Sequence, residues 1–340
     1  MIFRIKFATI VLACIFLGGA SSVLAQQKGQ WVPGQFGLNA GVIPDPGITY
    51  ANLALDYSAS QLNGPAGNKI PGITGTYSFW VDENIIYFVP KHKFLGGYFM
   101  PYIALNYATG EVVADFNGVM TGINLSGGGG GSGFADTYVQ PFNLGWHFGK
   151  RVDFNTGYSF TAPTGRFTQG ASNNVGSGYW GNDITSGTTL YITKNQGTTA
   201  NLATAYEIHG EKSGTNITPG QTFTMEWGLG QVLPLKKDMS MLAQVGVVGY
   251  DQWQVSHSSG TLTLAGGPGL PERLIPFYSV HGIGVQANFI LPAKALVGFF
   301  KYYDEYRALA RPEGHTFVFG LSWTLRIPKP QPAKPSGTTN

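Results

Sequence analysis

The chain has 340 residues, of which only 11% are charged and 14% are aromatic, and its formal net charge is +3. Soluble domains carry about 25% charged residues, so this composition argues against a soluble protein with charged outer faces. The balance of charge, without any basic block, excludes a nucleic-acid-binding surface. The single cysteine, Cys14, lies in the apolar N-terminal segment, so the rest of the chain can form neither a disulfide nor a thiolate metal site.

Residues 1–25 have the pattern of a secretory signal peptide. Arg4 and Lys6 precede an apolar run, which ends with small residues spaced as at a cleavage site, Val23 and Ala25. The run is too short to span a bilayer as a helix, so we expect cleavage after Ala25. Residues 26–47, irregular and containing glycine and proline, are predicted to form a periplasmic lead or a plug-like segment that folds into the following domain.

From residue 48 onward, apolar or aromatic residues repeatedly alternate with small polar ones. The stretch "VDFNTGYSFT" (152–161) has an apolar face with Phe154, Tyr158 and Phe160 and a polar face with Asp153, Asn155 and Ser159. Successive side chains of a strand point to opposite faces. Because the polar faces consist mostly of glycine, serine, threonine, asparagine and glutamine, they suit a water-filled lumen better than a soluble surface. We therefore predict that the apolar faces contact lipid.

The alternation predicts twelve strands, near residues 48–58, 76–90, 97–113, 134–148, 152–164, 185–194, 199–210, 221–234, 239–256, 275–291, 295–309 and 313–327. The even number is typical of single-chain bacterial barrels. The stretch 134–148 is expected to alternate without interruption, so that Asp136, Tyr138 and Phe148 share one face.

The connections between these strands alternate in length for most of the chain. Tight turns such as "GKR" (149–151) contrast with long segments such as the Gly-rich 114–133, which is expected to be a flexible external loop. Outer-membrane barrels have short periplasmic turns and longer external loops. The sequence therefore predicts an all-β fold, a transmembrane antiparallel β-barrel over 48–327, followed by a Pro-rich flexible tail at 328–340.

Nine side chains are predicted to face the lumen and to be candidates for contact with a permeating solute: Asp153, Asn155, Glu207, His209, Glu226, Asp251, Gln286, Lys301 and Glu305. Lining groups of this kind set the selectivity of a pore. The competing interpretation is that the charged ones form an ion-pair network that stiffens the wall and narrows the channel.

No cofactor and no metal site is predicted. The histidines form no pair at helical metal-ligand spacing. The letters "GIGVQA" (282–287) match a dinucleotide-binding fingerprint, but the strand pattern continues after them where that motif requires a helix.

Several stretches resemble an outer-membrane family named after the meta-cleavage pathway of phenol degradation. They include "YEIHGEKSGTNITPGQTFTMEWGLGQVL", "VGVVGYDQWQVS", "FYSVHGIGVQANFILP", "FKYYDEYRALARPEGHTFVFGLSW" and, near the start, "PDPGITYANLALDY". The resemblance covers residues 45–326 and is strongest after residue 134. It implies a β-barrel in the bacterial outer membrane that acts as a transporter, and it supplies no substrate-binding residues.

The predicted function is passive uptake of small, hydrophobic or aromatic compounds across the outer membrane. The expected partners are outer-membrane lipid, the solute and the barrel-assembly machinery, with no nucleic acid. One alternative is a lipid hydrolase that uses His257 and Ser259 of "HSSG" (257–260). Another is a closed barrel that serves as a structural anchor or adhesin.

Overall fold

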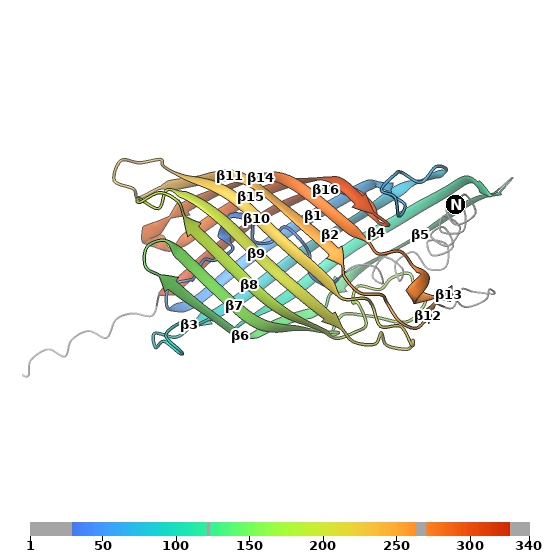
Figure 1. Cartoon of the computed structure of the whole chain (residues 1–340), viewed down its shortest axis with the longest axis horizontal. Helices are drawn as coiled ribbons and strands as arrows, with labels where there is room; N and C mark the ends of the chain where they lie inside the picture. The colour runs from blue at the N-terminus through green and yellow to red at the C-terminus, as the bar shows by residue number, and fades with distance from the viewer. Residues whose placement is uncertain (1–28, 121–122, 263–269, 327–340) are drawn as a thin grey trace, which may run out of the picture.

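The computed structural model describes residues 29–120, 123–262 and 270–326, and the predicted signal peptide and tail lie outside them. Twelve long antiparallel strands form a closed barrel (Figure 1). They are β1 Gly47–Leu62, β2 Ile73–Val89, β4 Tyr102–Met120, β6 Thr137–Phe148, β7 Val152–Ala162, β8 Gly181–Tyr191, β9 Thr198–His209, β10 Thr222–Pro234, β11 Leu242–Gln254, β14 Ser279–Leu291, β15 Leu296–Leu309 and β16 Pro312–Arg326. The predicted fold class and strand number are confirmed.

Two pairings close the ring. Strand β1 pairs with β16 along its whole length, from Gly47 opposite Arg326 to Leu62 opposite Pro312. Strand β4 meets β6 over only three residue pairs, Tyr102–Gln140, Ile103–Val139 and Ala104–Tyr138. Short pieces complete the fold: β3 Tyr98–Phe99, β12 Thr261–Leu262, β13 Leu270–Pro271, and the 3₁₀ turns η1 Gly37–Asn39, η2 Glu272–Leu274 and η3 Pro292–Lys294. No helix in the described ranges is long and apolar enough to cross a membrane.

The Gly-rich segment predicted as a flexible external loop is a strand instead. Strand β5 (Ile123–Phe134) pairs with the outer part of β4, so the two extend well past the rest of the barrel (Figure 1). Glycine has no side chain to stand out from the pleat, so other backbone can lie directly against it. At Gly131 a Cβ atom would press on the backbone of Asn173, which belongs to a neighbouring loop.

A β-bulge in β6 breaks the uninterrupted alternation predicted for residues 134–148. Val139 lies opposite Phe160 and Phe142 opposite Tyr158, so β6 contains one residue more than its partner over this interval. Pro141 lies in the bulge, where its missing N–H costs no ladder bond. The prediction of one continuous face is therefore wrong: Gln140 is buried inside the barrel, whereas Phe142, two positions later, is 57% exposed on the outside.

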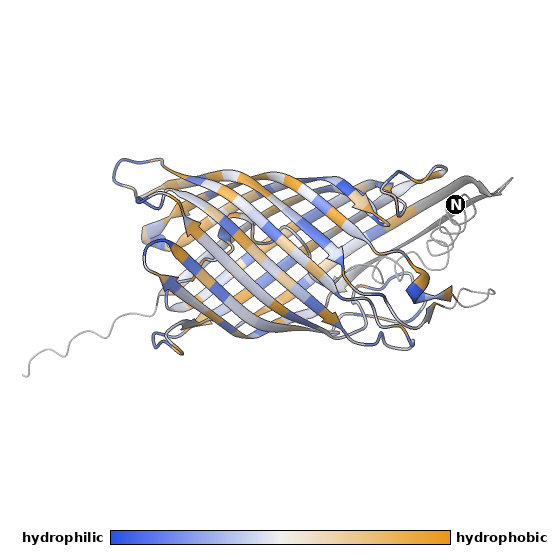
Figure 2. Ribbon diagram, in the orientation of Figure 1, coloured by the Kyte–Doolittle hydropathy of each residue, from blue (hydrophilic) through white to orange (hydrophobic). Residues whose placement is uncertain are grey.

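Outside the bulge, apolar and polar residues alternate along the strands as expected (Figure 2). Tyr158 lies on the outer face, and Asp153 and Ser159 are buried inside. In the β1–β2 hairpin the polarity is reversed: Leu53, Leu55, Phe79 and other apolar residues face the interior. The outer face of this hairpin carries a hydrogen-bonded polar cluster that comprises Tyr50, Asn52, Asp82 and Asn84. The barrel interior therefore has one apolar wall.

Candidate functional site

Residues 29–46 lie inside the barrel and form a plug, the name used below for this segment. Glu226 of β10 holds its middle by accepting hydrogen bonds from four donors: Trp31 Nε1 at 3.2 Å, Gln35 N at 3.3 Å, Phe36 N at 2.8 Å and Gly37 N at 3.4 Å. The irregular backbone of the plug has no ladder partners of its own, and an unpaired buried N–H is costly. One buried carboxylate thus satisfies three backbone donors and an indole.

Other lumen side chains complete this docking. Glu207 accepts from Trp31 N at 2.8 Å, and Gln286 accepts from Leu38 N at 2.9 Å. Lys301 donates to the carbonyl oxygens of Gly34, at 3.1 Å, and of Gln35. Asn155 donates to Ala40 O at 3.1 Å. Carboxylates meet N–H groups and the ammonium meets carbonyl groups, so the polar wall of the barrel is complementary to the plug backbone.

Small residues let the plug lie directly on the wall. A Cβ atom at Gly187 of β8 would overlap the carbonyl oxygen of Ala40, and one at Gly41 would overlap the backbone at Thr189. Such positions require glycine because the two backbones approach closely.

Replacing Gly187 with valine is expected to push the plug off β8, because the new side chain needs the space of Ala40. A cysteine introduced at Ala40 should then react faster with a membrane-impermeant thiol reagent. Gly298→Val is the matched control, since nothing lies within 4 Å of a Cβ there. Equal labelling rates in the two variants would show that the plug does not rest on β8.

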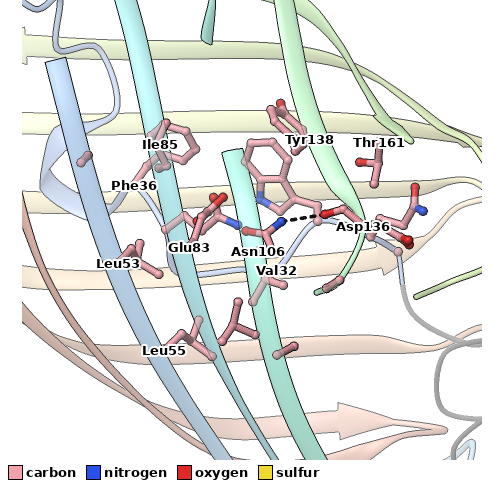
Figure 3. Close-up of a pocket in the computed structure, with 18 of the residues that line it drawn as sticks. Val32, Phe36, Leu53, Leu55, Glu83, Ile85, Asn106, Asp136, Tyr138 and Thr161 are labelled. Carbon is pink, nitrogen blue, oxygen red and sulfur yellow. Dashed lines mark hydrogen bonds between the residues drawn. The ribbon is translucent and has the colours of Figure 1, made fainter. Parts of the chain in front are cut away.

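A cavity of about 530 Å³ lies between the plug and the apolar wall formed by β1, β2, β4 and β6 (Figure 3). Its lining extends from Pro44 and Tyr87, near the end of the barrel with the short turns, to Gly130 and Ser177, near the end with the long loops. In outer-membrane barrels these ends face the periplasm and the outside, respectively. The cavity therefore follows the barrel across the membrane.

Aromatic rings form a continuous row along this cavity. The ring centroids of Tyr87 and Tyr102 are 4.5 Å apart, and those of Tyr102 and Tyr138 are 5.6 Å apart. Trp31 of the plug meets Tyr138 edge-on at 6.2 Å and stacks on Phe36 at 5.7 Å. Stacked and edge-on arrangements are the favoured ones for aromatic pairs, so the row presents an ordered surface to a planar solute.

Most of the nine predicted lumen residues lie inside the barrel but bind other parts of the protein. Five of them bind the plug: Asn155, Glu207, Glu226, Gln286 and Lys301. Of the nine, only Asn155 also lines the cavity.

The remaining four lie away from the cavity. Asp153 lies 2.6 Å from His147 Nδ1 and accepts from Tyr191 OH at 2.9 Å. The Nδ1 atom of His209 lies 2.9 Å from Gly220 O. The carboxylate of Glu305 accepts hydrogen bonds from Tyr57, Tyr250, Arg311 and Gly314. The arrangement agrees with the competing interpretation of a bonded polar network for these positions, and their contact with a solute stays a prediction.

The inward orientation predicted for Asp251 is wrong. Asp251 lies on the outer face of β11, opposite Met225, with its carboxylate 2.6 Å from His281 Nδ1 and 3.2 Å from Trp227 Nε1. On this strand Val248, Tyr250 and Gln252 are buried inside, so residue 251 has the outward parity. Near the rim of a barrel an outward carboxylate can be accommodated by the polar atoms of an interfacial His and Trp.

Apart from Asn155, the residues that line the cavity were not identified from the sequence. Glu83, Asn106 and Tyr138 belong to the first strands of the barrel, where the alternation is inverted or interrupted by the bulge. The sequence signal that could have identified Glu83 is the stretch "VDEN" (81–84), in which three consecutive polar residues follow Val81 inside a largely apolar strand. One of three successive strand residues must face away from the other two, which places Glu83 opposite to Asp82 and Asn84.

The "HSSG" motif does not form a Ser-His pair in the described structure. The ring of His257 packs against Phe277 with centroids 4.5 Å apart, and the backbone of Ser259 bridges to Thr218. Ser258 Oγ accepts from Gly220 N at 3.0 Å. These contacts are those of an ordered loop.

Comparison with known proteins identifies the family. A family model described as "Putative MetA-pathway of phenol degradation" matches residues 59–319. The barrel is similar to the COG4313 outer membrane channel from Pseudomonas putida F1, with a TM-score of 0.61 and 13% identity, covering 87% of this chain and 100% of that one.

Two further structures are less similar. The β domain of the Bordetella autotransporter BrkA has a TM-score of 0.47 at 12% identity, covering 83% of this chain and 100% of its own. A Pseudomonas aeruginosa FadL homologue has a TM-score of 0.41 at 10% identity, covering 88% and 100%. No match was found among curated proteins. The closed barrel with its apolar outer belt places the protein in the bacterial outer membrane, and the match over most of its length shows that the chain belongs to the phenol-degradation MetA-pathway family.

Proposed function

We propose that the protein is a passive channel for small, hydrophobic or aromatic compounds. The observation that carries this proposal is the 530 Å³ cavity, which follows the barrel between the plug and an apolar, aromatic wall. A solute would enter among the long loops, move along the row of rings and leave at the short-turn end without energy coupling. Export by a signal peptide and insertion by the barrel-assembly machinery belong to the same proposal.

The polarity of the cavity supports an apolar solute over a sugar. Leu53, Leu55 and Phe79 face it, whereas the carboxylates of Glu207 and Glu226 and the ammonium of Lys301 are bound to the plug. A sugar, with hydroxyl groups all around its ring, would lose hydration against these apolar side chains, which is costly. Aromatic faces instead provide large contact areas for a ring.

Solute flux into liposomes that contain the refolded barrel tests the proposal. We expect aromatic compounds to enter faster than in protein-free liposomes, and sugars of similar size to enter no faster. Equal acceleration of both would indicate a general pore and contradict the proposed selectivity.

Absence of any flux above that of protein-free liposomes would favour the closed anchor or the hydrolase. The hydrolase predicts lipase activity that Ser259→Ala abolishes while the barrel stays folded. The bonded loop around His257 and Ser259 gives no support for that outcome.

A further inference from the structure

One buried acidic side chain that lines the cavity has no hydrogen-bond donor in the described ranges. Glu83 of β2 lines the cavity and is only 8% exposed. No residue in the described ranges donates a hydrogen bond to its carboxylate. A buried carboxylate without donors is costly, so its presence needs an explanation.

Asn106 places a second acceptor beside it. Asn106 of β4 lies directly opposite Glu83 in the sheet, and Figure 3 shows the two side chains next to each other at the cavity. Its Nδ2 donates to Asp136 O at 2.9 Å, which directs Oδ1 elsewhere, and this buried oxygen has no partner. Directly opposite residues of an antiparallel pair have Cβ atoms about 4.5–5.5 Å apart, so one head group can reach both.

The other unpaired atoms of the cavity have the same polarity. Among described cavity-lining residues, the buried side-chain nitrogen and oxygen atoms without a partner are all amide oxygens: Gln30 Oε1, Asn106 Oδ1 and Asn143 Oδ1. The buried unpaired atoms of the cavity are thus hydrogen-bond acceptors.

The nearest charged and aromatic groups favour a donor as well. Lys301 acts electrostatically on Glu83, but its ammonium is already hydrogen-bonded to the plug carbonyl groups of Gly34 and Gln35. The faces of Tyr87, Tyr102 and Tyr138 carry negative electrostatic potential, which attracts cations and N–H or O–H donors.

We infer that Glu83 and Asn106 form a binding site, midway along the cavity, for an apolar or aromatic molecule whose head group donates hydrogen bonds, either an ammonium or a hydroxyl, and that this site discriminates against carboxylates. The inference rests on the proposed function in so far as it takes the cavity as the passage. It specifies which of the small aromatic compounds are held there.

Four compounds that differ only in the head group test it: benzylammonium, benzyl alcohol, toluene and benzoate. Their equilibrium binding to the folded barrel in detergent is measured by calorimetry, with protein-free micelles as the blank. A hydrogen bond to a charged group contributes roughly tenfold or more in affinity, so we expect benzylammonium to bind about tenfold more tightly than toluene, benzyl alcohol to be intermediate, and benzoate to bind most weakly. If benzoate binds as tightly as benzylammonium, the inference is wrong.

Glu83→Gln keeps the size of the side chain and removes its charge. We expect it to weaken benzylammonium about tenfold and to leave toluene unchanged. Asp56→Asn, on the exposed outer face of the same hairpin, is the matched control and should change neither. Because the variant and the wild type are measured in the same detergent, partitioning of the compounds into micelles affects both apparent affinities equally. Equal affinities of wild type and Glu83→Gln for benzylammonium would overturn the assignment of Glu83.

Binding and flux separate this inference from the proposed function. Glu83-dependent binding without flux would leave the site intact and contradict the channel. Flux of all four compounds above that of protein-free liposomes, without preferential binding, would leave the channel intact and contradict the site.

Discussion

Exchanging Glu226 for glutamine is expected to release the plug and to raise the single-channel conductance of the barrel in planar bilayers several-fold. Both carboxylate oxygens accept hydrogen bonds from the plug: Oε1 from Trp31 and Gln35, Oε2 from Phe36 and Gly37. In glutamine an NH₂ group replaces one of these oxygen atoms. The NH₂ group is itself a donor and cannot accept the two hydrogen bonds that this oxygen accepted. Losing two bonds to a charged acceptor costs about 3 kcal/mol, which corresponds to about a hundredfold larger population of released plug.

Asp153→Asn is the control for the loss of a lumen charge. Asp153 is buried in the lumen, but its carboxylate is bonded to His147 and Tyr191 of the wall and not to the plug. Its conductance should stay close to that of the wild type. Similar conductance in all three proteins would mean that other contacts, such as those of Lys301 and Gln286, suffice to hold the plug.

Replacing Ala108 with tryptophan is expected to lower aromatic flux at least tenfold. Ala108 of β4 lines the cavity, and an indole there would fill much of the space between β4 and the plug. Leu105→Trp is the matched control, because Leu105 lies on the outer face of the same strand and is 44% exposed. An outward tryptophan contacts lipid and should leave both flux and folding unchanged.

This pair of variants also shows which route the solute takes. A blocked Ala108→Trp barrel beside an active Leu105→Trp barrel would place the path in the cavity. Undiminished flux through Ala108→Trp would place it elsewhere in the lumen. The folded state of each variant can be checked by the heat-dependent mobility shift of the barrel in gels.

Local periodicity was enough to predict the barrel itself. Alternation such as Asp153, Phe154 and Asn155 repeats over strands long enough to cross a bilayer, and low charge left lipid as the partner of the apolar faces. The faces of β7 and most lumen carboxylates follow from this pattern because each residue's orientation depends on its neighbours in the chain. The pattern fails at the β-bulge of β6, which contains Pro141 as part of one extra residue's length of strand. It also fails at Asp251, a polar side chain that is hydrogen-bonded on the outer face.

The site depends on residues that are far apart in the sequence. Trp31 binds Glu207 across 176 positions and Gly34 binds Lys301 across 267, so no local pattern could show that these lumen charges hold a plug. The sequence also could not show that the apolar side of the β1–β2 hairpin faces the interior. That side lines the cavity instead of contacting lipid, and alternation alone does not distinguish the two. The sequence by itself determined a membrane barrel, because strand periodicity and composition are properties of neighbouring residues. Only the tertiary structure decided where the cavity lies, because the plug occupies the polar half of the lumen through hydrogen bonds and leaves Glu83 and the aromatic wall facing open space.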